Sequence, residues 1–324
     1  MGLIANIVLE GDIKATAKLM RYIEEEDIKA VEELKYLYVH IGNSYIIGIT
    51  GLPGSGKSSL IDMIIDYFRI NKKTVGVIAI DPTSPFTGGS ILGDRIRMQN
   101  HSTDRDVFIK SLPTKGWHGG ISKVTSRMIT VMDAMGKDII LVETAGVGQT
   151  EVEIKDLVHT TVVVLVGGLG DYIQIVKTGI LEIADIFVIN KADNDNTEQL
   201  EFDLKNLFSL DDSSSKTNIG QTWKPLIYLT EAVNDKGIDK LIEGITLHES
   251  YLKSTNKFSQ YFKDKSINDL KDIISDYLIN LLFKKLENDS LYKKLLGDLT
   301  SNKIDPYTAA EKISREFLNF KNKR

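Results

Sequence analysis

A glycine-rich segment at residues 51–58 has the composition and spacing of a phosphate-binding loop. The segment reads Gly51-Leu52-Pro53-Gly54-Ser55-Gly56-Lys57-Ser58 and is followed by Ser59. Glycines allow backbone N–H groups to approach a phosphate closely. In this pattern Lys57 reaches the β- and γ-phosphates, and the Ser58 hydroxyl binds Mg²⁺. These residues therefore predict a site for a nucleoside triphosphate and Mg²⁺.

A second short segment, Asn190-Lys191-Ala192-Asp193, has residues that can select the base of the nucleotide. A carboxylate such as that of Asp193 accepts hydrogen bonds from two neighbouring donors at once. Guanine offers a ring N–H beside an exocyclic amine, whereas adenine presents an unprotonated ring nitrogen there. The two segments together therefore predict that GTP and GDP bind in preference to ATP.

Two acidic residues end apolar runs that we expect to be strands. Asp81 follows the run 74–80, and Glu143 lies at the end of the run 138–144, next to its last residue, in the Walker B position. Ligands of open parallel sheets bind at the carboxyl ends of the strands. We therefore expect both carboxylates to face Mg²⁺, directly or through water, and to act in catalysis with Lys57. The alternative for Asp81 is a capping carboxylate at the start of a turn.

Two further stretches have the composition of moving parts. In residues 143–149 (Glu-Thr-Ala-Gly-Val-Gly-Gln), we expect the Gly146 N–H to contact the γ-phosphate and Gln149 to orient the attacking water. A polar loop residue is the alternative for Gln149. Residues 87–98 are glycine-rich and then charged, as a mobile switch is, and they contain Asp94. Asp94 is a candidate catalytic residue, with a solvated helix residue as the alternative.

The elements that must position these residues alternate between strands and helices. Seven short apolar, β-branched runs lie between helical stretches, at residues 45–50, 74–80, 107–112, 138–144, 160–166, 186–190 and 226–230. Continuous apolar strands suit a sheet that is covered on both faces. Alternating strands and helices imply parallel βαβ units with right-handed crossovers. We therefore predict an α/β fold with a mostly parallel sheet and helices on both faces.

The composition is that of an ordinary globular chain without a basic surplus. Of 324 residues, 42% are hydrophobic and 26% are charged, and the net charge is −5. This balance argues against nucleic-acid binding, which usually uses a basic face. The lack of cysteine excludes disulfides and thiolate metal sites. No run approaches the roughly 20 apolar residues that span a bilayer, and the first residues lack a signal-peptide pattern. We therefore expect a soluble cytoplasmic protein without membrane contact.

We expect three regions along the chain. Residues 1–42 are a helical extension, residues 43–236 form the nucleotide-binding domain, and residues 237–324 are helical without a strand signal. The last region contains a broad apolar stripe that consists of Leu270, Ile273, Ile274, Tyr277, Leu278, Leu281 and Leu282. Such a stripe covers the chain's own core or meets a partner helix.

Together these residues resemble the MeaB/ArgK family of P-loop GTPases. The resemblance rests on residues 81–89 (Asp-Pro-Thr-Ser-Pro-Phe-Thr-Gly-Gly), 92–98 (Leu-Gly-Asp-Arg-Ile-Arg-Met) and 143–149. It covers nearly the whole chain, from residue 9 to residue 310. It implies a SIMIBI-type P-loop fold with a C-terminal helical arm that forms a homodimer. It also implies a chaperone of an adenosylcobalamin-dependent acyl-CoA mutase, namely methylmalonyl-CoA mutase.

The resemblance assigns roles to two segments without a simple motif. Residues 167–177 match a third switch that contacts the mutase, so Gln174 and Lys177 become partner-facing candidates. The loop that contacts the base in this family matches Glu231, Ala232 and Val233. This chain departs from the family pattern in both segments, since Tyr172 stands where an acidic residue is usual and Glu231 stands where serine is usual.

The residues and the resemblance predict a Mg²⁺-dependent GTPase whose slow hydrolysis of GTP to GDP and phosphate drives a switch for the cobalamin enzyme. GTPases without a supplied positive charge are up to about 10⁵-fold slower. The alternatives are a GTPase that delivers a metal to a hydrogenase or urease, a P-loop kinase of a small molecule, and a nucleotide-gated scaffold that does not hydrolyse GTP. The lack of cysteine opposes metal delivery, and Asp193 opposes an ATP-dependent kinase.

Overall fold

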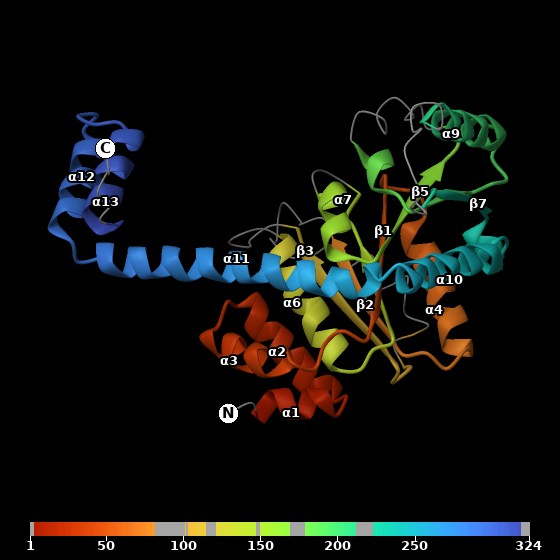
Figure 1. Ribbon diagram of the computed structural model, residues 1–324, viewed down its shortest axis with the longest axis horizontal. Coiled ribbons are helices and arrows are strands. Elements are labelled where there is room, and N and C mark those ends of the chain that lie inside the picture. The colour runs from red at the N-terminus through yellow and green to blue at the C-terminus, as the bar shows by residue number, and fades with distance from the viewer. Residues whose placement is uncertain are drawn as a thin grey trace. The chain divides into compact units, whose positions relative to one another are not determined.

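A seven-stranded parallel β-sheet forms the centre of the first of two units in this protein (Figure 1). The computed structural model describes residues 3–81, 101, 103–114, 121–146, 150–168, 179–211 and 223–318. The chain divides into a unit of residues 1–265 and a unit of residues 266–324. The sheet and both predicted nucleotide-binding segments belong to the first unit.

The strands follow the order β3-β2-β4-β1-β5-β6-β7, and every neighbouring pair is parallel. Their bounds are β1 (Tyr45–Gly51), β2 (Val75–Asp81), β3 (Val107–Pro113), β4 (Ile139–Glu143), β5 (Thr160–Val166), β6 (Ile186–Asn190) and β7 (Leu226–Thr230). All seven predicted runs form strands, with each end within one residue of the prediction. The α/β prediction is confirmed.

Helices cover both faces of the sheet because successive strand residues point to opposite sides. On one face, Ile47 of β1 and Leu141 of β4 pack with α4 (Lys57–Ile70) and α10 (Ile238–Ser254). On the other face, Ile46 and Ile140 pack with the remaining helical layer. That layer contains α1 (Leu3–Leu9), α2 (Ile13–Glu24), α3 (Ile28–Leu37), α6 (Ile121–Ala134), η2 (Ile154–Leu157), η3 (Ile180–Ile183) and α9 (Thr197–Asp211). The short helices α7 (Thr150–Glu153) and η4 (Ala232–Asn234) complete the first unit.

The N-terminal helices begin at aspartates and pack against the body of the first unit. Asp12 caps α2 by accepting from the Ala15 N–H at 2.7 Å, and Asp27 caps α3 in the same way. Such caps satisfy backbone donors that a helix leaves open at its start. The buried Glu33 of α3 accepts from the Ala5 N–H of α1 at 2.7 Å. Caps and this cross-link hold the three helices as one layer.

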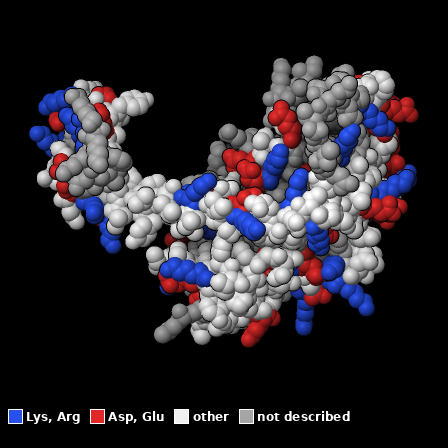
Figure 2. Space-filling model, viewed as in Figure 1, with Lys and Arg blue, Asp and Glu red and all other residues white. Residues whose placement is uncertain are grey.

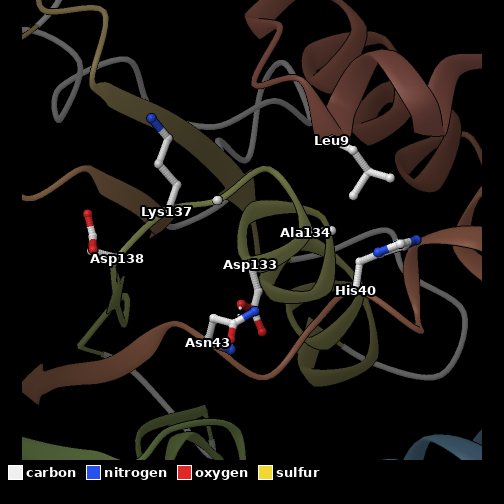
Figure 3. Close-up of a pocket in the computed structure, with 8 residues that line it drawn as sticks. Leu9, His40, Asn43, Asp133, Ala134, Lys137 and Asp138 are labelled. Carbon is white, nitrogen blue, oxygen red and sulfur yellow. Dashed lines mark hydrogen bonds between the residues drawn. The ribbon is translucent and has the colours of Figure 1, made fainter.

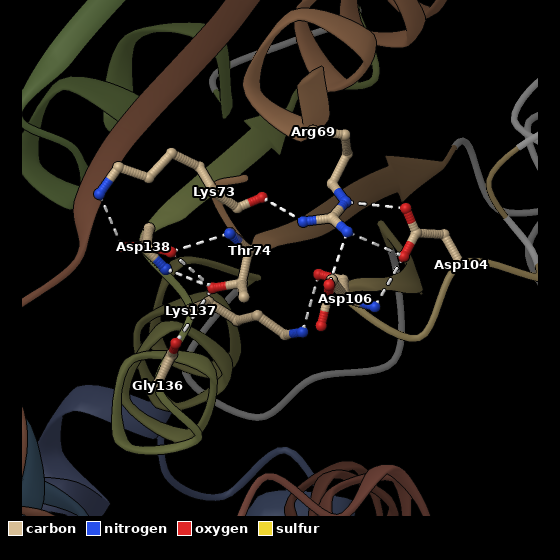
Figure 4. Close-up of polar contacts among 8 residues, drawn as sticks. All are labelled: Arg69, Lys73, Thr74, Asp104, Asp106, Gly136, Lys137 and Asp138. Carbon is tan, nitrogen blue, oxygen red and sulfur yellow. Dashed lines mark hydrogen bonds and ion pairs between the residues drawn. The ribbon is translucent and has the colours of Figure 1, made fainter. Parts of the chain in front are cut away.

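Charged side chains tie the amino ends of the strands together, at the edge away from the phosphate-binding loop (Figure 4). Arg69 at the end of α4 binds Asp104 at 2.7 Å and Asp106 at 2.6 Å, just before β3. The hydrogen bond from Arg69 lowers the pKa of Asp104. Lys137, before β4, donates to the Asp106 carbonyl at 3.0 Å, and burial lowers the pKa of its ammonium. This network fixes the spacing of β2, β3 and β4 where they begin.

A cavity of about 360 Å³ lies at the same amino edge, lined in part by Leu9, His40, Asn43 and Asp133 (Figure 3). The buried Asp133 carboxylate accepts from the backbone N–H groups of Gly42, Asn43 and Ser44 at 2.6 to 3.2 Å. These bonds fix the chain as it passes from the N-terminal helices into β1. The cavity thus lies at the amino edge of the sheet, whereas the nucleotide site is predicted at the carboxyl edge.

The second unit consists of helices. The 30-residue helix α11 (Lys257–Leu286) begins in the first unit, and it is followed by α12 (Ser290–Thr300) and α13 (Pro306–Leu318). Leu286, Leu295 and Ala309 form its small buried core. Six members of the predicted apolar stripe on α11 are exposed, between 43% for Leu281 and 68% for Tyr277.

Charges of both signs are interspersed on the face drawn in Figure 2. In the described part of the chain, the structure contains no helix with the length and apolar character needed to cross a membrane.

Candidate functional site

Glycines give the loop between β1 and α4 a backbone path that other residues do not fit. Gly51, Gly54 and Gly56 all have positive φ angles, of 144°, 80° and 89°. A Cβ on Gly51 would lie 2.2 Å from the Val164 carbonyl oxygen, and one on Gly56 would lie 2.3 Å from Nδ2 of Asn190. At Gly51 and Gly56, both the positive φ angle and the lack of space for a Cβ therefore exclude other residues. The loop thus has the shape that the sequence predicts.

The start of α4 presents the features of an anion site. The helix begins at Lys57, and its N-cap is Gly56, which has no side chain to occupy the first N–H groups. Those N–H groups and the helix dipole favour a phosphate there. Lys57 is 7% exposed, and its Nζ donates to the carbonyls of Gly51 at 2.8 Å and Leu52 at 3.2 Å. Its ammonium therefore already lies within the loop.

The predicted metal-facing residues gather at the carboxyl edge of the sheet. The Ser58 hydroxyl donates to Oε1 of Glu143 at 2.8 Å, and both side chains are buried. Asp81 is 2% exposed and ends β2, which pairs with β4 so that Ala79 lies beside Glu143. A hydroxyl and two carboxylates are oxygen ligands of the kind that Mg²⁺ prefers. The donor set of Ser58, Asp81 and Glu143 therefore fits Mg²⁺.

The chain that leaves β4 packs directly on the phosphate-binding loop. Gly146 has a φ of 80° and is buried. A Cβ at this position would lie 2.8 Å from Nζ of Lys57 and 2.9 Å from the Gly51 carbonyl oxygen and from the Pro53 nitrogen. Only glycine permits this approach. The Gly146 backbone is thus adjacent to the lysine that we expect to contact the γ-phosphate.

Asn190 links the two predicted segments through its side chain. Its Nδ2 donates to the Ser55 carbonyl at 2.9 Å, across 135 residues of sequence. Its Oδ1 accepts from the Thr230 hydroxyl at 3.1 Å and from the Ala232 N–H at 3.2 Å. Asn190 is 2% exposed. It therefore holds the phosphate-binding loop, the end of β6 and the loop after β7 in one arrangement.

Lys191 and Asp193 of the second segment are exposed beside this link, and Ala192 between them is half-buried. Lys191 has a φ of 55°, and its Nζ donates to the Gly54 carbonyl at 2.9 Å. Asp193 is exposed. The Ala192 N–H donates to the Thr230 carbonyl, which continues the pairing of β6 and β7 by one residue. The carboxylate predicted to bind guanine is thus on a loop that the sheet anchors near the phosphate-binding loop.

The predicted base-contact loop forms a tight turn after β7. Glu231 accepts from Asn234 at 2.9 Å and from Lys236 at 2.9 Å, and these hydrogen bonds lower the pKa of Glu231. The N–H of Ala232 is bound to Asn190, as described above, whereas Val233 is 88% exposed. The loop therefore lies next to the segment 190–193, and the acid at position 231 forms bonds within the loop.

Several predicted residues fall where no structural statement is possible. Asp94, Gln149, Gln174 and Lys177 lie outside the described residues, and their roles stay predictions. The rest of the phosphate-binding loop is described, with Leu52 and Ser59 half-buried, Pro53 and Gly54 exposed and Ser55 buried.

A contact between two threonines at this edge was not expected from the sequence. Thr50 and Thr144, at the ends of β1 and β4, are joined by a hydrogen bond of 3.0 Å between their hydroxyls. The signal was present in the sequence as a threonine directly before Gly51 and another directly after Glu143. The sequence did not show that the two strands are neighbours.

The fold and the site define a P-loop nucleotide-binding protein. A glycine-rich loop joins the central strand β1 to a helix that starts with Lys57 and Ser58, and Asn190 connects it to the loop that bears Asp193. The sequence model of the family described as "Methylmalonyl Co-A mutase-associated GTPase MeaB" matches residues 16–287. The chain belongs to this family of P-loop GTPases, which confirms the resemblance seen in the sequence.

Curated relatives and a solved structure agree with this assignment. A putative GTPase of Pyrococcus abyssi is 43% identical over 310 residues, which are 95% of this chain and 94% of the relative. GTPase ArgK of Escherichia coli is 29% identical over 313 residues, which are 95% and 94% of the two chains. A crystal structure described as a LAO/AO transport system kinase aligns with a TM-score of 0.68 at 23% identity, over 98% of this chain and 96% of that one. This last likeness shows the shared fold.

Proposed function

We propose that this protein hydrolyses GTP to GDP and phosphate and uses the reaction as a switch. The observation that carries the proposal is the cluster at the carboxyl edge of the sheet. There Lys57 lies beside Gly146, Ser58 donates to Glu143, and Asn190 ties the loop of Lys57 and Ser58 to the segment that bears Asp193. The phosphate-binding loop is thus connected to the loop whose carboxylate we expect to select the base. Membership of a GTPase family supports the same reaction.

The residues of the site divide the work of phosphoryl transfer. Lys57 and the N-terminal N–H groups of α4 stabilise negative charge on the transferring phosphoryl group. Ser58, Asp81 and Glu143 would hold Mg²⁺, which neutralises phosphate charge when bound. We expect the N–H of Gly146, which lies beside Lys57, to sense the loss of the γ-phosphate. Asp94 and Gln149 remain candidates for completing the site around the attacking water.

Base selection is tested by the substitution Asp193→Asn. An asparagine side chain presents an N–H₂ group in place of one carboxylate oxygen, so it opposes one of the two guanine donors. Binding of GDP and ADP is measured by calorimetry for the wild type, for Asp193→Asn and for the control Asp195→Asn, which alters an exposed aspartate two residues away. The preference for GDP should fall at least tenfold in Asp193→Asn alone. Unchanged selectivity would remove the assignment.

We further propose that the switch serves an adenosylcobalamin-dependent acyl-CoA mutase, namely methylmalonyl-CoA mutase, as a cytoplasmic chaperone. The description of the matching family supports this partner. The test is to mix the protein with the purified mutase, look for a complex by size-exclusion chromatography and measure GTP hydrolysis with and without the mutase. Complex formation with faster hydrolysis supports the proposal. No complex and no change in rate would leave only the GTPase activity.

We also propose that the protein acts as a homodimer through α11. The exposed stripe on this helix includes Ile273, Tyr277 and Leu278, each at least 51% exposed. A row of large apolar side chains on one helix is stable in water when a partner helix covers it. No observation among the described residues favours metal delivery or small-molecule phosphorylation over the proposal made here.

A further inference from the structure

Two buried threonines join the ends of the strands that carry the phosphate-binding loop and Glu143. The Thr144 hydroxyl donates to the Thr50 hydroxyl at 3.0 Å. Thr50 is 0% exposed and Thr144 is 1% exposed. The two residues are 94 positions apart in the sequence, and the parallel pairing of β1 with β4 brings them together. This bond is therefore a link between the two halves of the proposed catalytic site.

The link lies at the point where the two strands separate. Ile49 of β1 is paired with Glu143 of β4, and the Thr144 N–H donates to the Ile49 carbonyl at 3.1 Å. That backbone bond comes one residue after Glu143, the last paired residue of β4. After it, β1 continues into Gly51 and the loop, and β4 continues into Gly146. The bond between the threonine hydroxyls adds one further connection beyond the backbone ladder.

We propose that Thr144 and Thr50 are positioning residues for GTP hydrolysis. Their bond fixes the direction in which the chain leaves β4, and so places Glu143 opposite Ser58 and Gly146 against Lys57. Space at Gly146 is restricted, since even a Cβ there would lie within 2.8 Å of Nζ of Lys57. A small rotation of this chain therefore changes the contact with the phosphate-binding loop. The inference depends on the GTPase activity proposed above.

The choice of threonine at both positions supports a role for the hydroxyls. Valine has nearly the same shape as threonine and suits a buried β-strand at least as well. A buried hydroxyl is tolerated when it is hydrogen-bonded, and it destabilises the fold when its partner is removed. The pair thus gives orientation that two valines would not give.

The test compares Thr144→Val, Thr50→Val and the double variant with Thr144→Ser, which keeps the hydroxyl. Thr125→Val is the matched control, because Thr125 is 0% exposed and its hydroxyl donates to the Ile121 carbonyl within α6 at 2.8 Å. The kcat and KM for GTP are measured, together with the Mg²⁺ concentration that gives half-maximal turnover. Thermal unfolding is followed for every variant to record the structural effect alone.

We expect Thr144→Val to lower kcat about tenfold, equivalent to about 1.4 kcal/mol of activation free energy. The KM should stay within about twofold, and the Mg²⁺ midpoint should rise by a similar factor to the loss in kcat. Thr144→Ser should restore most of kcat. The kcat of the double variant should be no lower than that of the less active single variant, because each single substitution already removes the same hydrogen bond. Thr125→Val should shift the unfolding temperature and leave kcat and the Mg²⁺ midpoint unchanged.

The proposal is overturned if the valine variants at positions 50 and 144 behave like Thr125→Val, with altered stability and unaltered kcat and Mg²⁺ midpoint. If the wild type itself does not hydrolyse GTP, the proposed function fails, but the positioning role is still decided. In that case the Mg²⁺ concentration that half-saturates binding of a non-hydrolysable GTP analogue replaces turnover. A midpoint raised in Thr144→Val and restored in Thr144→Ser supports the link, and an unchanged midpoint overturns it.

Discussion

His159 should make the stability of this protein fall as the pH is lowered from 7 to 5. The imidazole is 7% exposed and lies directly before β5, where its Nδ1 accepts from the Ile46 N–H at 3.0 Å. Its ring stacks on Phe258 of α11 with centroids 4.3 Å apart, and it also contacts Tyr261 at 4.1 Å. A protonated ring would lose the bond from Ile46 and would place a charge among aromatic rings. Burial lowers the pKa of His159 to about 3.

The sign and size of the effect follow from linkage. An unfolded histidine has a pKa of about 6.5, so between pH 6.5 and pH 3 the unfolded chain binds the proton that folded His159 excludes. Stability is therefore lost as the pH falls through this window. Between pH 7 and pH 5 the loss from this one group amounts to about 2 kcal/mol.

Other buried groups also change protonation in or near this pH range, so the experiment must cancel their effects on stability. Burial raises the pKa of Asp185 to about 6. The contribution of Asp185 to the stability of the protein is therefore lost as the pH rises towards 6, which is opposite in sign to the effect of His159. Burial lowers the pKa of His248 to about 4, with the same sign as His159. Both groups are present in the wild type and in a His159 variant. The difference between the two proteins therefore isolates His159.

The substitution to use is His159→Asn, because asparagine keeps an acceptor near Nδ1 and does not titrate. Urea unfolding followed by tryptophan fluorescence at pH 7 and at pH 5 gives the free energies. The variant should be less stable than the wild type at pH 7, since it loses the ring stacking, and this gap should shrink by about 2 kcal/mol at pH 5. His40→Asn, at an exposed histidine, is the control and should show no such change. A gap that is equal at the two pH values would refute the reasoning.

Three further predictions concern the loop, the link between segments and the arm. Gly51→Ala should destabilise the protein by more than about 2 kcal/mol, since its Cβ would meet the Val164 carbonyl at 2.2 Å and its φ is unfavourable; a thermal unfolding midpoint equal to that of the wild type would contradict this. Asn190→Ala should cost about 2–3 kcal/mol and weaken GDP binding, because the Ser55 carbonyl and two other groups lose their partner; urea unfolding and calorimetry measure both effects, and neither should be spared. Leu278→Asp should convert a dimer to a monomer in light scattering, since the side chain is 55% exposed on the stripe, and a dimer that persists would exclude this face as the interface.

The strands were predictable because their apolar runs are short, continuous and bounded by polar turns. Runs such as 139–142 and 162–165 are buried on both faces of the sheet, so they leave little choice of conformation. The helices around the sheet were less determined. The expected C-terminal helical region, 237–324, includes residues 238–254, whereas Leu241 and Ile245 of α10 pack on the face of the sheet that bears Ile47 and Leu141. A helical apolar face shows that something covers it and does not show what.

The sequence alone determined the class of the protein. The spacing of glycines and Lys57 requires a phosphate-binding loop, because these residue types set the backbone path and the charge locally. The tertiary structure decided how the parts act together. Only the order of strands places Thr144 beside Thr50 and lets Asn190 reach the Ser55 carbonyl, over separations of 94 and 135 residues. Contacts of this kind depend on which strands are neighbours, and local residue patterns do not specify that.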